Sequence, residues 1–162
     1  MKKIVLTGAA GRLGSYLREP LSKLCDEFVS SDLVDNLNNL QHNETYVQAD
    51  ITDLEAMVSL LDGADMVVHF GAVGDEAPME VLWGPNFYGA YTVWEAAYRN
   101  KLRRVVYASS IHAVGMHKKT DFIGIDAPHK PDTFYGLAKC FAEDLASLYW
   151  DKRGLESVCM RI

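Results

Sequence analysis

The sequence predicts an α/β fold in which a parallel sheet is covered by helices on both faces, the doubly wound arrangement. Six short runs are apolar on both faces, as strands buried between two helical layers are. Longer stretches with helical periodicity separate these runs, and a glycine triplet directly follows the first of them. The predicted strands are 4–6, 27–31, 45–48, 66–70, 104–109 and 156–161, and the predicted helices are about 12–24, 53–61, 78–99 and 134–152.

The order of these elements predicts the topology of the sheet. The chain opens with two lysines and an apolar run of three residues, too short for a signal peptide's apolar core, so 4–6 is the first strand. Pro85 is expected to kink or restart the third helix, and Asp132 or Thr133 is expected to cap the fourth. Right-handed crossovers then predict the strand order 321456, with a ligand crevice at the carboxyl ends of strands 1 and 4.

Composition limits the class of protein. With 162 residues, 49% of them hydrophobic, the chain fits one domain, residues 1–162, that buries a substantial core. A net charge of -6, with basic residues scattered apart from His117-Lys118-Lys119, argues against nucleic acid or an anionic membrane surface as a partner. No run approaches the roughly 18 apolar residues of a membrane span, and no metal-ligand pattern occurs.

The cysteines predict the compartment. Cys25, Cys140 and Cys159 are odd in number, show no CxxC spacing and lie in apolar surroundings. This usage is typical of reduced thiols in the cytoplasm and not of a disulfide or zinc framework. We therefore expect a cytoplasmic protein.

The segment TGAAGRLG, residues 7–14, has the features of a phosphate-binding loop. Gly8 would allow the tight turn, Gly11 would let the backbone approach a pyrophosphate, and Gly14 would allow helix and strand to pack closely. Together with Arg12 and Leu13, these glycines would present free N–H groups at the positive end of the helix dipole. A dinucleotide is the predicted ligand, with ordinary turn glycines as the alternative.

Further cofactor contacts are predicted at the ends of the second, third and fourth strands. Asp32 lies 18 residues after Gly14, where its carboxylate can bind both hydroxyls of the adenosine ribose. The same carboxylate would repel a 2'-phosphate, and this favours NAD over NADP even if Arg12 softens that repulsion. Asp50 and Ile51 could border the adenine, although Asp50 is equally compatible with a capping or loop role. The small residues of Phe70-Gly71-Ala72 would let the nucleotide lie against bare backbone, and tight strand–helix packing is the alternative.

A catalytic group is predicted at the rim of the same crevice. Ser110 follows the fifth strand, and Tyr135 and Lys139, at positions i and i+4, share one face of the fourth helix. A free tyrosine has a pKa of about 10, and a cation 4 to 6 Å away would contribute roughly 3 to 4 kcal/mol toward ionising it. The hypothesis is that Tyr135, assisted by Lys139, removes a hydroxyl proton while Ser110 orients that hydroxyl.

Three other polar residues have weaker predicted roles. His69 is flanked by apolar residues and is expected to be a packed core histidine. His112, two residues after Ser110, is equally compatible with packing and with lining a substrate pocket. Asn86, beside Pro85, is expected to bond the opened backbone of the kinked helix.

Several motifs occur in chain order, namely TGAAGRLG, Asp32, Asp50-Ile51, HFGAV, Asn86 with GAYTVWEAA, YASS and YGLAK. Together they resemble the extended short-chain dehydrogenase/reductases, the NAD-dependent epimerase/dehydratase group with a Rossmann fold. Within that group, YASSIHAVG and YGLAKCFAEDLASLYWDKRG are most similar to uronate dehydrogenases. The resemblance implies oxidation of the C1 hydroxyl of a hexuronic acid to an aldarolactone, with hydride passed to NAD. It assigns cofactor binding to Gly8, Gly11, Leu13, Asp32, Asp50 and Ile51, and catalysis to Ser110, Tyr135 and Lys139.

The chain departs from this pattern in two ways. At the positions of two sugar-binding residues, an asparagine and a serine, it has Ile111 and Gly74. Family members also continue beyond the sixth strand into a substrate-binding region, so the chain resembles their cofactor-binding part. A nucleotide-sugar epimerase or dehydratase, and a non-catalytic NAD-binding fragment, are therefore alternatives.

The resemblance also implies a homodimer. The dimer that the resemblance implies is joined through the helices 78–99 and 134–152 in a four-helix bundle. In this chain those helices carry many aromatic residues, namely Trp83, Tyr91, Trp94, Tyr98, Tyr149 and Trp150.

Overall fold

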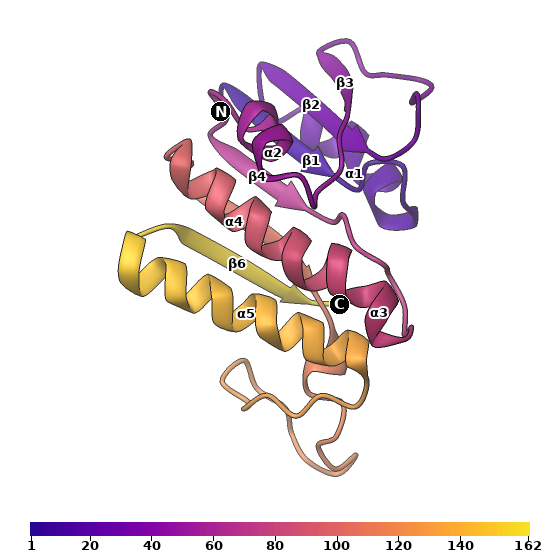
Figure 1. The fold of residues 1–162 in the computed structure, drawn as a ribbon, viewed down its shortest axis with the longest axis vertical. Coiled ribbons are helices and arrows are strands. Elements are labelled where there is room, and N and C mark those ends of the chain that lie inside the picture. Colours follow the sequence, from indigo (N-terminus) through magenta and orange to yellow (C-terminus); the bar gives the residue numbers. More distant parts are fainter.

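A parallel six-stranded sheet forms the centre of the molecule (Figure 1). The structure, a computed structural model, describes residues 1–162. The strand order is β3-β2-β1-β4-β5-β6, and every neighbouring pair is parallel, so the predicted order 321456 is confirmed. The strands are β1 Lys3–Thr7, β2 Glu27–Asp32, β3 Glu44–Gln48, β4 Met66–His69, β5 Arg104–Ser109 and β6 Glu156–Arg161.

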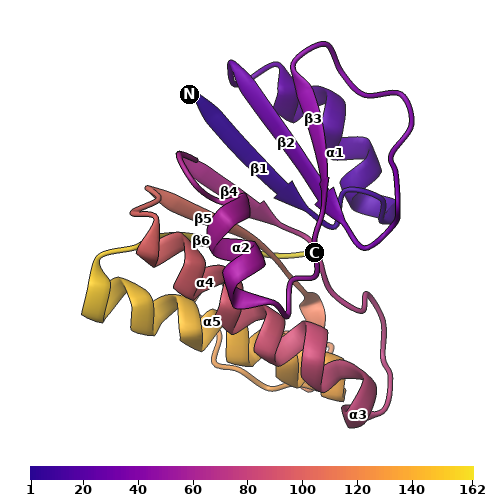
Figure 2. The ribbon, with the colours of Figure 1, turned by 45° about the horizontal axis from the view of Figure 1, so that its top comes forward.

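Helices cover both faces of the sheet (Figure 2). On one face α2, α4 and α5 pack side by side, and on the other α1 lies against β1 and β2. The helices are α1 Arg12–Ser22, α2 Leu54–Leu60, α3 Met79–Leu82, α4 Gly89–Arg99 and α5 Phe134–Arg153. None of them is both long and apolar enough to span a bilayer.

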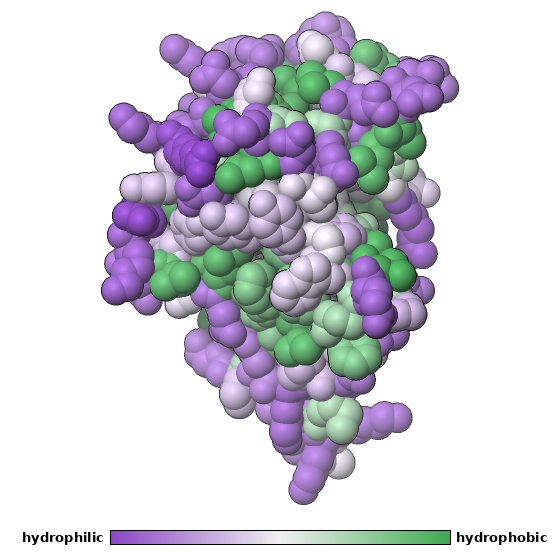
Figure 3. Space-filling model, viewed as in Figure 1, coloured by the Kyte–Doolittle hydropathy of each residue, from purple (hydrophilic) through white to green (hydrophobic).

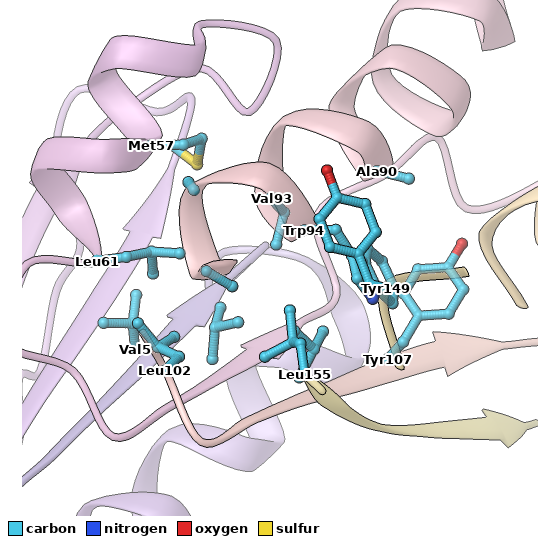
Figure 4. Packing of buried hydrophobic residues seen from close by; sticks show 14 of the residues in the cluster. Val5, Met57, Leu61, Ala90, Val93, Trp94, Leu102, Tyr107, Tyr149 and Leu155 are labelled. Atoms are coloured by element: carbon cyan, nitrogen blue, oxygen red, sulfur yellow. The ribbon is translucent and has the colours of Figure 1, made fainter. Parts of the chain in front are cut away.

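The central strands send alternate side chains into two apolar layers. In β1, Val5 joins the larger cluster beneath α2, α4 and α5, which includes Val93 and Trp94 (Figure 4). Its neighbours Ile4 and Leu6 are fully buried in a second cluster on the α1 side. Each such fully buried aliphatic side chain contributes about 1.5–3 kcal/mol to stability. These buried strands hold their carboxyl ends, where the site lies, in fixed relative positions.

The predicted helix 78–99 is interrupted at Pro85, as expected. A π-helical segment, η1 Trp83–Tyr88, separates α3 from α4, because proline cannot donate the backbone hydrogen bond that a regular helix needs there. Asn86 is buried in this segment, but the expectation that it bonds its own helix is wrong. Its Oδ1 accepts from the Val73 N–H and its Nδ2 donates to the Val73 carbonyl, both at 2.9 Å. The wide turn directs Asn86 towards the connection that follows β4.

The ends of α5 follow ordinary capping chemistry. Thr133 is the N-cap, and its hydroxyl accepts a 2.8 Å hydrogen bond from the Gly136 N–H. Gly154, at φ 69°, ends the helix in the left-handed region. Of the two predicted caps, Thr133 is therefore the one used.

The connection between β5 and α5 was not predicted in detail. It begins with a 3₁₀ turn, η2 Ile111–Ala113, and residues 114–133 then project from the body of the molecule (Figure 1). Backbone hydrogen bonds of 2.9 Å join Met116 and Ala113 to Lys130 and close its base. This base brings η2 against the start of α5.

Candidate active site

The glycine loop between β1 and α1 is shaped by close backbone contacts. Gly8 has φ 74°, and a Cβ there would lie 2.6 Å from the Gly71 nitrogen. A Cβ on Gly14 would lie 2.0 Å from the Gly8 carbonyl oxygen, and one on Gly11 would lie 3.2 Å from the same atom. The loop therefore packs against itself and against the end of β4 in a way that requires glycine at positions 8 and 14 and leaves little room at position 11.

The start of α1 is suited to an anion. Its N-cap, Gly11, offers no side-chain acceptor, and the first turn contains no acidic residue. The first N–H groups of a helix have no intrahelical acceptor and lie at the positive end of its dipole. Arg12 and Leu13, also predicted to contact the cofactor, are exposed in this turn. The cradle therefore fits a pyrophosphate.

Asp32, at the end of β2, lies beside this loop. Its Oδ2 accepts from the Ala10 N–H at 2.8 Å, and its Oδ1 accepts from the Leu33 N–H at 2.7 Å. A carboxylate has about four lone-pair positions, so about two remain for ribose hydroxyls. The geometry is compatible with the predicted ribose contact and adds a tie between Asp32 and the glycine loop.

Ile51 and the end of β4 form one wall of the crevice. A Cβ on Gly71 would lie 3.2 Å from the Ile51 side chain, and one on Gly89 would lie 2.9 Å from it. Phe70 and Ala72, which flank Gly71, are half-buried. The tight packing named as an alternative for 70–72 is present, and their cofactor contact stays a prediction.

Asp50 has a local structural role. Its Oδ1 accepts hydrogen bonds of 2.8 Å from both the N–H and the hydroxyl of Thr52. The N-cap of α2 is instead Asp53, whose carboxylate accepts from the Ala56 N–H at 3.0 Å. Asp50 thus shapes the loop after β3, and its contact with adenine stays a prediction.

Ser110, Tyr135 and Lys139 lie together at the end of β5. Ser110 is buried, Tyr135 is half-buried, and Lys139 is only 2% exposed. The helix can approach this closely because a Cβ on Gly136 would lie 2.3 Å from the His112 carbonyl oxygen. The Lys139 Nζ lies 5.0 Å from the centre of the Tyr135 ring and donates to the Ala108 carbonyl at 2.7 Å. The structure therefore brings the three predicted catalytic residues together.

The protonation of this group differs from the expectation in one respect. Burial raises the pKa of Tyr135 above its ordinary value, and the negative charge of Asp75 raises it further, while Ser110 acts in the opposite direction. Burial also lowers the pKa of Lys139 to about 8. The net pKa of Tyr135 is thus raised and not lowered as expected, because removal of the phenol from water dominates.

The predicted substrate side is more open. A Cβ on Gly74 would meet no atom within 4 Å, and Ile111 is 61% exposed. His112 Nδ1 lies 2.9 Å from an Asp132 carboxylate oxygen, and the His112 ring meets the Tyr135 ring edge-on at 5.9 Å. His112 is thus held next to Tyr135 by an acidic partner.

A cavity of about 1340 Å³ lies beside β6 and is lined by several residues of 117–125. Ile111 and His112 line it, but Ser110, Tyr135, Lys139 and the glycine loop do not. This cavity adjoins the candidate site and is separate from the cofactor crevice.

Glu76 is a site residue that sequence reasoning missed. Its carboxylate accepts from the N–H groups of Phe134 at 3.2 Å and Tyr135 at 2.8 Å. It thereby provides acceptors for N–H groups in the first turn of α5 that have no intrahelical partner, and it links the β4–α3 connection to the helix that carries Tyr135. Nothing in the local sequence around Glu76 identifies this distant partner.

Glu143 forms a second unpredicted link, one helical turn after Lys139. It accepts from the Ser109 hydroxyl, from His129 at 2.9 Å, and from Arg161 at 2.7 and 3.1 Å. Burial raises its pKa, but the hydrogen bonds outweigh burial and hold the pKa below its ordinary value. One carboxylate therefore joins β5, β6, α5 and the 114–133 connection.

His69 is a buried structural histidine, as predicted. Its Nδ1 lies 2.7 Å from the Thr7 hydroxyl oxygen, which also accepts from the Gly71 N–H at 3.3 Å. Burial, with the nearby charge of Lys139, lowers the pKa of His69 to about 3. A neutral imidazole thus helps to fix the ends of β1 and β4, where the crevice begins.

The fold and the glycine loop define a dinucleotide-binding protein. Residues 4–162 match the NAD dependent epimerase/dehydratase family, so the chain belongs to that family. It is 39% identical over 160 residues to uronate dehydrogenase from Pseudomonas putida, covering 99% of this chain and 60% of that enzyme. The chain thus spans about three-fifths of the length of this relative.

Two solved structures are similarly close. Glucuronic acid dehydrogenase from Chromohalobacter salexigens has a TM-score of 0.95 at 39% identity, covering 99% of this chain and 60% of that one. A tyrosine-to-alanine variant of uronate dehydrogenase from Agrobacterium tumefaciens, in complex with NAD, has a TM-score of 0.92 at 39% identity, covering 97% and 59%. These findings confirm the predicted family and NAD as its cofactor, and they support an oxidoreductase of the extended short-chain dehydrogenase type.

Proposed function

We propose that residues 1–162 form the dinucleotide-binding unit of an NAD-dependent dehydrogenase that oxidises the C1 hydroxyl of a hexuronic acid to an aldarolactone. The observation that carries this proposal is the grouping of Ser110, Tyr135 and Lys139 at the crevice whose glycine cradle fits a pyrophosphate. The similarity to uronate dehydrogenases over nearly the whole chain supports the substrate class. The C-terminal region of those relatives has no counterpart among these residues.

In the proposed reaction the sugar loses a hydride from C1 and a proton from the C1 hydroxyl, and the C1–O bond becomes the carbonyl of the lactone. NAD, when bound, supplies the hydride acceptor. Tyr135 takes the proton as general base, and the Ser110 hydroxyl orients the reacting oxygen. The net products are lactone, NADH and one proton.

Lys139 makes the base role feasible. A tyrosine must lose its own proton before it can accept one, and burial opposes this ionisation. At about 5 Å and an effective dielectric near 20, a cation stabilises a phenolate by about 3 kcal/mol. Lys139, whose Nζ lies against the Tyr135 ring, is the proposed source of this stabilisation.

On the substrate side we propose Gly74, Ile111 and His112 as contacts, together with Ser110. His112 is the strongest of these, since Asp132 holds its ring beside Tyr135. Gly74 and Ile111 offer no side-chain hydrogen bond to a sugar. Hydroxyl contacts elsewhere must then provide the selectivity between hexuronic acids.

NADH formation tests the proposal. The 162-residue chain and the complete gene product are each incubated with NAD and D-galacturonate or D-glucuronate, beside a Tyr135→Phe control. We expect NADH from the complete protein and at least a hundredfold less from the variant. NAD binding without NADH would redirect the assignment to an epimerase or a binding module, and a variant within threefold of wild type would exclude Tyr135 as the base.

We further propose a homodimer joined through α4 and α5. Exposed apolar residues form a stripe along α5 at helical spacing, and pale and green atoms gather over α4 and α5 in Figure 3. The stripe comprises Phe134, Leu137, Phe141 and Leu148. Sedimentation should show a dimer at micromolar concentration that Leu148→Glu weakens. A wild-type monomer would contradict the proposal.

A cytoplasmic location also stays a proposal. All three cysteines are free thiols, and Cys140 is buried. Burial raises the pKa of Cys140 to about 11 and that of Cys159 to about 12, which keeps both sulfurs protonated and unreactive. These properties suit core packing in a reducing compartment.

A further inference from the structure

Lys139 carries a buried charge without an acidic partner. The side chain is 2% exposed, and its ammonium has three N–H donors. It donates one hydrogen bond, of 2.7 Å, to the Ala108 carbonyl, and no carboxylate lies within ion-pair distance. An ammonium in such a setting needs other stabilisation to stay charged.

Aromatic rings supply that stabilisation from two elements. The Lys139 Nζ lies 4.7 Å from the centre of the Tyr107 ring in β5 and 5.0 Å from that of Tyr135 in α5. A cation within about 6 Å of an aromatic face is attracted by the ring quadrupole, most strongly where water is excluded. The two tyrosines therefore place their π systems on the same buried ammonium.

Tyr107 is the more rigid of the two rings. It is 2% exposed, and it packs edge-on against Trp94 at 5.3 Å (Figure 4). The His69 ring lies tilted against it at 5.5 Å. Tyr135, by contrast, is half-buried at the first turn of α5. Tyr107 can therefore fix the ammonium from beneath, on the side away from the substrate crevice.

The other titratable groups nearby do not replace this contact. His69 in β4 is neutral at working pH. Glu143 in α5 is already engaged by Ser109, His129 and Arg161. The titratable groups that face Lys139 and Tyr107 from the packed elements are His69, Tyr135, Glu143 and Cys159.

We propose that Tyr107 is a positioning residue whose ring holds the Lys139 ammonium in place and charged beneath Tyr135. The contact itself stands on this geometry, and its importance for turnover rests on the proposed function. Tyr107 is the first residue of the YASS motif, but the resemblance assigns a catalytic role only to Ser110 in that motif and none to Tyr107.

Lysine NMR tests the contact without any enzymatic assay. The side-chain resonances of ¹³C,¹⁵N-lysine-labelled protein are titrated with pH, and Lys139 is assigned through Lys139→Gln. Tyr107→Phe keeps the aromatic face, whereas pentafluorophenylalanine at position 107 keeps the shape and removes the negative face. We expect the pKa of Lys139, about 8 in the wild type, to stay unchanged in Tyr107→Phe and to fall by about one unit in the fluorinated protein.

Two further variants control for packing. Tyr107→Met has a flexible side chain without a ring face and should also lower the pKa of Lys139. Val105→Ala removes a buried side chain from the same strand and the same apolar cluster but not from the contact with Lys139. It should therefore reduce stability and leave the pKa of Lys139 unchanged. An unchanged Lys139 pKa in the fluorinated and Met variants would overturn the proposal.

Activity provides a separate readout in the complete protein. If charged Lys139 assists Tyr135, the alkaline decline of kcat/KM should move to lower pH in the fluorinated protein and stay in place in Tyr107→Phe. A shifted Lys139 pKa with an unshifted rate profile would uphold the contact and count against the proposed catalytic role of Lys139. The failure of one proposal is thus distinguishable from the failure of the other.

Discussion

Gly14→Ala should disable the cofactor cradle. A Cβ at this position would lie 2.0 Å from the Gly8 carbonyl oxygen and 2.8 Å from its carbon, whereas ordinary contacts begin near 3.4 Å. The start of α1 and the glycine loop must therefore separate by about 1.4 Å. Overpacking of this kind costs about 1–3 kcal/mol, which for a chain of this size lowers the unfolding temperature by about 4–8 °C at the middle of that range.

The same displacement should weaken NAD binding. The N–H groups at the start of α1 would no longer converge on one pyrophosphate, and each lost charge-assisted hydrogen bond costs about 1.5–3 kcal/mol. The expected increase in Kd is therefore at least about tenfold. Thermal unfolding and calorimetric titration with NAD measure the two effects separately.

Gly124→Ala is the matched control, because a Cβ there meets no atom within 4 Å and the backbone is not left-handed. It should leave both unfolding temperature and NAD affinity at wild-type values. A Gly14→Ala protein that matches Gly124→Ala in both measurements would refute the steric reasoning and remove the main structural support for the cradle.

Three other predictions concern charge and capping. Lys139→Met should abolish activity and yet raise the unfolding temperature at pH 7. Burial lowers the pKa of Lys139 from 10.5 to about 8, so the buried charge destabilises the folded protein fully below pH 8 and not at all above about pH 10.5. The gain in unfolding temperature should therefore vanish by about pH 10.5. His69 has a pKa of about 3 in the folded protein, so below pH 6.5 the free energy of unfolding should fall by up to about 1.4 kcal/mol per pH unit. In His69→Asn, the free energy of unfolding measured by urea titration should fall less steeply with decreasing pH. Glu76→Ala should cost about 1 kcal/mol, because it leaves the N–H groups of Phe134 and Tyr135 without their acceptor, and should raise KM; Asp126→Ala, in the exposed connection, should change neither.

Much of the fold could be predicted because its signals are local. Strands such as 66–70 and 104–109 are apolar runs between polar ends, and their predicted bounds differ from the structure by at most one residue. Pro85 correctly predicted an interruption, since a missing N–H breaks a helix wherever it occurs. The π-helical form was not predictable, because it depends on how Asn86 reaches Val73 across the fold.

The candidate site divides in the same way. The glycines, Asp32 and the pair Tyr135 and Lys139 have characteristic spacings, so the sequence could predict them as candidate site residues. Glu76 and Tyr107 act through partners 59 and 32 positions away, and nothing in their own neighbourhoods specifies those contacts. The protonation of Tyr135 was misjudged because burial is a property of the folded chain.

The network around Glu143 has a consequence for the order in which the chain assembles. Arg161, which supplies the guanidinium, is 18 residues further along and belongs to β6. A nascent chain emerges from its N-terminus, so Ser109, His129 and α5 exist before that guanidinium does. Until β6 emerges, Glu143 has Ser109 and His129 as hydrogen-bond donors but lacks its guanidinium partner. The phosphate loop can therefore form early during synthesis, whereas the surroundings of Ser110 are complete only after β6 has emerged.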